Sequence, residues 1–361
     1  MGCNTDVFRI GLAIPLQGPG GIFGPSCEAV AELAVARLNN TDGILGRPVE
    51  VEVLDAGAPV EEFCDHTMQR VQAGAVHAVV GWHISTVRQH MAPVLAQLNI
   101  PYVYTSLHEG AVGEAVLCPG ETPAMQVLPG LRWLTEHLGL HRWTIVGSDY
   151  VWPRRTSRAV RAYAEASHSN IVGELYVRYG CRDFAGVLRD LERSSCDAVI
   201  MLLVGRDAVL FNRQFAASGM QDRMVRFSPL MEENMLLASG HSATSNLYVA
   251  AAYFNSLSTA SAMDFTGSYL DRFGPHAPAL NNAAESCYEG ILALAASANA
   301  VHSIDSHQIL ATIEQRGVTY NGPRGTVHLG VGRSRQQVHI ARADHYDFDI
   351  IATLPEPLVQ S

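Results

Sequence analysis

Strand-like and helix-like segments alternate along most of this chain, and that alternation limits its possible folds more than any other feature. Apolar runs such as Phe8–Pro15 and Ala78–Trp82 are short and fit buried strands. Between them lie segments of about 12 residues with apolar positions at helical spacing, which end at Asn or Gly. Strands separated by such helices predict parallel sheets that are covered on both faces.

The pattern stops near residues 119–122 and then begins again. We therefore expect an α/β chain with two doubly wound parallel-sheet lobes joined by a multi-strand hinge. The helical segments at 260–300 have no alternating strands of their own, so they must cover one of the earlier sheets. The tail, residues 326–353, has the pattern of antiparallel strands. The expected lobes are residues 7–120 with 252–325 and residues 121–251 with 326–355, and the usual ligand site of such a design is a cleft lined by the carboxyl ends of strands.

The basic residues are unusual because all 25 are Arg. A chain without lysine lacks the side-chain amine that a Schiff-base enzyme, a Walker-type phosphate loop or a Ser-x-x-Lys acyl enzyme uses. The 35 acidic residues give a net charge of −10, and the arginines are scattered. This charge distribution argues against direct nucleic-acid binding.

The start of the sequence and the cysteines bear on location. The first residues show no leader-like segment, and no run of about 20 apolar residues occurs, so we expect a cytoplasmic protein. The alternative is an extracytoplasmic lipoprotein attached near Cys3, from which a signal peptide was removed. The seven cysteines contain no Cys-x-x-Cys pair, so we expect free thiols and neither a zinc knuckle nor a dithiol redox pair.

Polar and aromatic side chains gather where predicted strands end. Trp82 and Ser85 follow the third strand, and Ser85 could cap the next helix or bind an oxygen of a ligand. Tyr104, Ser106 and Glu109 follow the fourth strand in a segment dense in hydroxyl groups. Such groups each need a partner in a core, which favours a ligand-facing role.

The second half repeats this arrangement. Tyr150 and Trp152 follow a strand and could close over a small ligand. Arg206 lies in a loop beside Asp207, with which it could simply pair.

Signatures of enzymes and cofactors are missing. The glycine-rich segment 17–24 fails the spacing of a dinucleotide fingerprint, since Phe23 stands at the third glycine position. No Gly-x-Ser-x-Gly elbow and no ligand-spaced His pair occurs. We therefore expect a binding protein that is not an enzyme and has no cofactor and no metal.

The order of elements, the segment 38–49 and Asp55 at a strand end resemble the type 1 periplasmic-binding-protein fold. Residues 147–154 are close to the Gly-Ser-Asp-Tyr-aromatic-Pro-Arg signature of the amide sensors that regulate aliphatic amidase expression, and of their urea- and short-chain amide-binding relatives. The resemblance runs, with gaps, from Ile10 to about Pro355.

This resemblance implies two lobes that close on a small ligand, which is held by Ser85, Tyr104, Ser106 and Tyr150. Hydroxyl groups suit a neutral amide, because it offers one acceptor and two donors. Trp82, Tyr150 and Trp152 would wall a small pocket. The resemblance further implies a homo-oligomer that signals to a separate regulator protein and controls gene expression.

Some segments depart from the sensor pattern. Arg206 stands where the sensors have Thr, and Glu233 lies in a stretch where they have Thr-Thr-Ser-Glu. A guanidinium that recognises a carboxylate and a carboxylate that holds an ammonium would shift the ligand toward an amino acid. The alternative function is therefore the exported substrate-binding component of an ABC transporter for amides, urea or branched-chain or polar amino acids, with an ABC permease as its partner.

Overall fold

The computed structural model describes residues 7–110, 116–167, 169–330 and 333–355, and the chain forms two compact units. Unit 1 consists of residues 1–120 and 258–336, and unit 2 of residues 121–257 and 337–361. The chain therefore passes from one unit to the other three times. The expected α/β class, with parallel sheets and covering helices, is confirmed.

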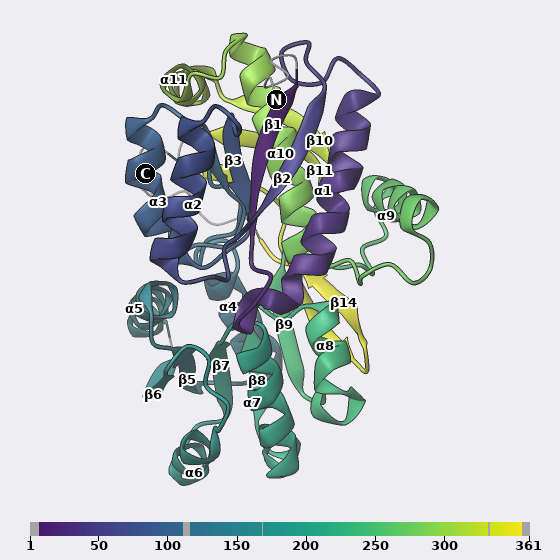
Figure 1. Ribbon diagram of the computed structural model, residues 1–361. Helices are drawn as coiled ribbons and strands as arrows, with labels where there is room; N and C mark the ends of the chain where they lie inside the picture. Colours follow the sequence, from purple (N-terminus) through teal and green to yellow (C-terminus); the bar gives the residue numbers. More distant parts are fainter. Residues whose placement is uncertain (1–6, 111–115, 168, 331–332, 356–361) are drawn as a thin grey trace. The chain divides into compact units, whose positions relative to one another are not determined.

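Unit 1 is built on a four-stranded parallel sheet with the strand order β2-β1-β3-β4. Helices α2 and α3 cover one face, and α1 and α10 cover the other (Figure 1). The bounds of these elements are β1 (Phe8–Ile14), η1 (Pro19–Phe23), α1 (Gly24–Asn39), β2 (Val49–Asp55), α2 (Val60–Gln72), β3 (Ala78–Gly81), α3 (Ser85–Gln97), β4 (Tyr102–Tyr104) and α10 (Asn282–Val301).

Both faces of this sheet are packed with apolar side chains. On the α2 and α3 side, Phe63, Val87 and Met91 are buried in one cluster with residues of the strands. On the other side α10 contacts α1, β3 and β4, and nearly all of its side chains are buried. Its N-cap, Asn281, accepts a hydrogen bond from the Ala284 amide at 2.8 Å. The expectation that a late helix covers an earlier sheet is met by α10.

A small antiparallel sheet of the order β10-β11-β12 completes unit 1. Arg324 in its first turn is buried and forms ion pairs with Glu285, at 3.1 Å, and with Glu289, both on α10. These contacts fix the turn against the helix. The elements are α9 (Ala260–Phe273), α11 (Ser306–Arg316), β10 (Val318–Gly322), β11 (Gly325–Gly330) and β12 (Arg333–Arg335).

Unit 2 contains a seven-stranded sheet with the order β14-β13-β9-β8-β7-β5-β6. The strands from β9 to β6 are parallel, while β13 is antiparallel to both β9 and β14. Its strands are β5 (Arg142–Ser148), β6 (Asn170–Val177), β7 (Ala198–Leu202), β8 (Val225–Ser228), β9 (Leu247–Ala251), β13 (His339–Asp344) and β14 (Asp347–Thr353). Its helices are α4 (Val127–Leu138), α5 (Val151–Ala166), α6 (Ala185–Arg193), α7 (Arg206–Ala217), η2 (Met220–Asp222), α8 (Glu233–Ser239) and η3 (His241–Ala243).

The points at which the chain changes units differ from the expected ones. Residues 326–336 lie in unit 1, because β11 pairs with β10 and β10 contacts α10. Residues 252–257 follow β9 directly and stay with unit 2. The expected tail of antiparallel strands is therefore divided: β11 and β12 belong to the small sheet of unit 1, and β13 and β14 to the large sheet of unit 2.

Candidate functional site

Five of the predicted ligand residues lie at one edge of the unit 1 sheet. Trp82 and Ser85 follow β3, and Tyr104, Ser106 and Glu109 end or follow the neighbouring strand β4. All five side chains are buried, with Ser85 and Tyr104 each only 1% exposed. The parallel pairing of β3 with β4 brings these separate segments to the same edge.

The loop after β3 is held by hydrogen bonds to residues of β4 and just beyond it. The Ser106 hydroxyl accepts from the His83 amide at 3.0 Å and donates to the His83 carbonyl at 2.8 Å. The Tyr102 hydroxyl lies 2.9 Å from His83 Nε2. Burial lowers the pKa of His83 to about 3, so its imidazole is neutral. Ser106 thus fixes the loop from which Ser85 starts α3.

Ser85 is not the cap of α3. The N-cap is Ile84, which makes no side-chain cap bond, and Ser85 occupies the first helical position. Its hydroxyl donates to Glu109 Oε2 at 2.9 Å and lies 3.4 Å from the Tyr104 hydroxyl.

Glu109 and Arg88 form a buried ion pair beside these hydroxyl groups. An Arg88 Nη atom lies 2.5 Å from Glu109 Oε1, and the two side chains are 5% and 0% exposed. The guanidinium also lies over the Tyr104 ring, 4.9 Å from its centroid. Burial acts to raise the pKa of Glu109, but the hydrogen bonds and charge of Arg88, together with the Ser85 bond, more than offset it and lower that pKa. Glu109 is therefore an anion at neutral pH.

Arg88 and His83 were missed as members of this group. Arg88 stands three residues after Ser85 on α3, so helical spacing alone places both on one face. The spacing from Ser85 was the available signal, but it does not identify Glu109 as the partner of Arg88.

The other four predicted residues lie at strand ends of unit 2. Tyr150 and Trp152 follow β5, Arg206 begins α7 after β7, and Glu233 begins α8 after β8. The rings of Tyr150 and Trp152 are 6.3 Å apart, and Tyr150 also meets Tyr179 edge-on at 5.8 Å. Trp152 and Glu233 are buried, and Tyr150 is half-buried.

Two carboxyl groups of unit 2 have raised pKa values. Burial raises the pKa of Glu233 to about 8, although its Oε1 accepts from the Asn255 amide at 2.7 Å. Burial also raises the pKa of Asp207 to about 6, and its Oδ2 accepts from the Gly180 amide at 2.7 Å. The Arg206 charge opposes the shift at Asp207. Glu233 is thus mostly uncharged at neutral pH.

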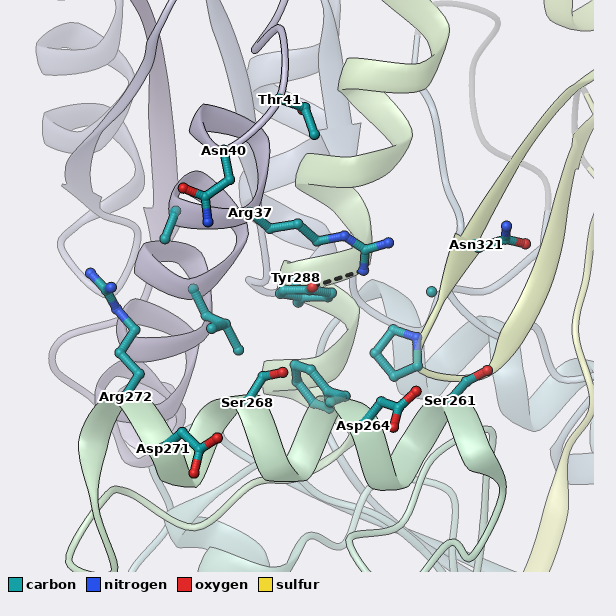
Figure 2. A pocket seen from close by; sticks show the side chains of 15 residues that line it. Arg37, Asn40, Thr41, Ser261, Asp264, Ser268, Asp271, Arg272, Tyr288 and Asn321 are labelled. Atoms are coloured by element: carbon teal, nitrogen blue, oxygen red, sulfur yellow. Dashed lines mark hydrogen bonds between the residues drawn. The ribbon is translucent and has the colours of Figure 1, made fainter.

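A separate groove of about 970 Å³ lies in unit 1, between α1, α9, α10 and β10. Figure 2 shows Arg37 of α1 reaching toward Tyr288 of α10, with which it forms a hydrogen bond of 3.0 Å. Asp264 and Arg272 line the α9 side, so both signs of charge are present. None of the predicted ligand residues lines this groove.

The described residues contain no group of three or more His, Cys, Asp or Glu that could hold a metal ion. Within the same residues, no helix has the length and apolar character needed to cross a membrane.

Comparison with known proteins identifies the fold. Residues 7–346 match a family model described as periplasmic binding protein. An ABC transporter solute-binding protein from Rhodopseudomonas palustris HaA2, in complex with p-hydroxybenzoic acid, has a TM-score of 0.87 at 15% identity, covering 98% of each chain. An ABC transporter substrate-binding protein from Sphaerobacter thermophilus has a TM-score of 0.82 at 20% identity, covering 97% of this chain and 98% of the other. A branched-chain amino acid transporter substrate-binding protein from Streptococcus pneumoniae, in complex with isoleucine, has a TM-score of 0.82 at 16% identity, covering 97% of this chain and all of the other.

This match corrects the expected location. Members of the matched family are extracytoplasmic substrate-binding proteins, so the expectation of a cytoplasmic protein is wrong. That expectation depended on the first few residues of the sequence, which do not decide where a protein resides. The family consists of solute-binding proteins and is non-enzymatic in general. With the match extending over residues 7–346, the chain belongs to the periplasmic binding protein family.

Proposed function

We propose that this protein is the substrate-binding component of an ABC transporter, and that its ligand is a short amide or urea. Family membership and the transporter proteins among its structural neighbours support the first part. The regulatory role implied by the resemblance to amide sensors has no support in the family match.

One observation carries the choice of ligand: the charged groups at the unit 1 edge already neutralise each other. Arg88 is paired with Glu109, and His83 is uncharged. Beside this pair, the Ser85 hydroxyl donates to Glu109 and can still accept a hydrogen bond, and the Tyr104 hydroxyl lies 3.4 Å from it. Hydroxyl groups can both donate and accept hydrogen bonds, which suits the carbonyl and N–H groups of an amide. A ligand with an unbalanced charge would be desolvated there without a partner.

An amino acid is the second candidate, because Arg206 and Glu233 stand at strand ends of unit 2. A guanidinium suits a carboxylate. However, the pKa of Glu233 is about 8, so most of its carboxyl groups carry no charge to attract an ammonium at neutral pH. This favours the amide over the amino acid.

Thermal unfolding with acetamide, butyramide, urea, leucine and benzoate would test the ligand class. We expect only the amides or urea to stabilise the protein, by about 2.7 kcal/mol at a concentration one hundred times Kd. Stabilisation by leucine alone would overturn the amide assignment.

Ser85→Ala should weaken amide binding by about tenfold, the loss expected for one hydrogen bond. The matched control is Ser268→Ala, an exposed serine of α9 that lines the separate groove. Titration calorimetry of both variants would show whether the effect is local to the proposed site.

A further inference from the structure

The environment of Glu109 has the composition of an anion-binding site. Its carboxylate meets the Arg88 guanidinium at 2.5 Å and the Ser85 hydroxyl at 2.9 Å, at the first turn of the 13-residue helix α3. The first turn of a helix is partly positive and presents N–H groups that lack partners within the helix. A guanidinium and a hydroxyl together form a donor set that suits a carboxylate, and the partly positive helix terminus from which Ser85 projects adds to the attraction.

Here the anion is supplied by the protein itself. The Glu109 side chain is fully buried and ionised, and the nearby imidazoles add no positive charge. Burial lowers the pKa of His83 to about 3 and that of His108 to about 4, so both rings are neutral. The Arg88 charge is thus matched by one internal carboxylate.

We infer that Glu109 is a specificity-determining residue whose carboxylate occupies the anion-binding donors of unit 1 and thereby excludes ligands that carry a carboxylate. This inference rests on the proposed function, since it assumes that Ser85 and Tyr104 contact the ligand. A carboxylate ligand at these hydroxyl groups would face the Glu109 charge, and like charges in a buried site repel strongly. An amide of the same shape carries no such charge.

Removing the Glu109 charge should change which ligands the site binds. In Glu109→Gln the shape is kept, but Arg88, whose side chain is 5% exposed in the wild type, loses its counter-ion. A buried cation without a partner is unfavourable, so a carboxylate ligand at the Ser85 and Tyr104 hydroxyl groups should no longer be repelled and should offset the Arg88 charge. The double variant Arg88→Gln with Glu109→Gln removes both charges and should not gain this binding.

The test uses two pairs of ligands that are matched in shape. They are butyramide with butyrate and benzamide with benzoate. For the wild type we expect the amide of whichever pair fits to bind at least about tenfold more tightly than its carboxylate. Glu109→Gln should gain about tenfold or more in affinity for the carboxylate, measured by titration calorimetry. The double variant should show no gain, and Glu62→Gln, an exposed acid on α2, should behave as the wild type.

The outcomes separate this inference from the proposed function. If the wild type binds amides but Glu109→Gln gains no carboxylate binding, the role of Glu109 is wrong and the proposed function stands. If the wild type binds no amide but Glu109→Gln gains carboxylate binding, the role of Glu109 stands and the ligand class is wrong. Absence of both effects overturns both. If Glu109→Gln does not fold, the wild-type comparison decides, and equal affinity for the two members of a pair overturns the inference.

Discussion

Buried arginines in this protein differ in the groups that stabilise their charge. Arg88 has an acidic partner, whereas Arg226 on β8 is fully buried and is held by neutral oxygens. Its guanidinium donates to Asn212 Oδ1 at 2.5 Å and to the carbonyls of Ala243 at 3.0 Å and Ser245 at 2.5 Å. Burial lowers the pKa of Arg226 to about 9, yet the group stays a cation at neutral pH.

Replacing Arg226 with Met should lower the free energy of unfolding by roughly 3 kcal/mol, because three buried acceptors lose their donor. Arg223→Met is the control, since Arg223 is 58% exposed and its contact with Glu192 is 3.8 Å long. Its cost should be below about 1 kcal/mol. Unfolding in guanidinium chloride would measure both, and similar midpoints for the two variants would contradict a structural role for Arg226.

Glu233 predicts a dependence of stability on pH. Burial, and to a smaller extent the Asp347 charge, raise its pKa from 4.5 to about 8. Between these values the unfolded chain releases the proton and the folded chain keeps it, so rising pH favours unfolding. We expect Glu233→Gln to remove a loss of roughly 4 kcal/mol between pH 5 and pH 8.5. Midpoints of unfolding in guanidinium chloride at both pH values would show this. A variant whose stability falls with rising pH as much as that of the wild type would be evidence against it.

At the scale of elements, the packing of α10 on the unit 1 sheet depends on a small residue. A Cβ atom on Gly290 would lie 2.3 Å from Thr105 Cγ2 and 3.0 Å from Val80 Cγ1. Gly267 on α9 is also helical, but a Cβ atom there would meet no atom within 4 Å. Comparing an alanine substitution at each of these glycines therefore separates the effect of packing from the effect of helix propensity.

Gly290→Ala should destabilise the protein by about 1–3 kcal/mol through overpacking. Gly267→Ala should be neutral or stabilise it by up to about 1 kcal/mol, because Ala is the better helix former. Thermal unfolding of the two variants side by side would test this. A stabilising Gly290→Ala would mean that α10 can move away from the sheet at little cost.

The alternation of strands and helices was predictable because parallel strands buried on both faces have continuous apolar runs. The small sheet was harder, since β10 is a five-residue strand whose place depends on its pairing with β11 and its contact with α10. Hydroxyl-rich strand ends such as Ser106 could be found from their positions. The ion pair of Arg88 with Glu109 could not, because it joins residues 21 positions apart through their tertiary placement.

For the whole molecule, the two units are both discontinuous in sequence. Unit 1 needs α10, which lies between α1 on one side and β3 and β4 on the other but comes from the second part of its sequence. Without α10, the part of this face that is formed by β3 and β4 would expose its apolar side chains to water.

We therefore expect residues 1–120 alone to show no cooperative unfolding transition. The same residues joined through a flexible linker to residues 258–336 should unfold cooperatively, since all parts of unit 1 are then present. Circular dichroism during a titration with guanidinium chloride would compare the two. A sharp transition for residues 1–120 alone would show that α10 is dispensable for the fold.

Because the chain passes between the units three times, both units contain segments that are synthesised late. A chain made from its N-terminus reaches β10 and β11 of unit 1 only after residue 318, and β13 and β14 of unit 2 only after residue 339. Neither unit is complete until translation is almost finished, and domains fold as units. In an extracytoplasmic family, a fold that is completed late suits transport of the chain across the membrane before it folds.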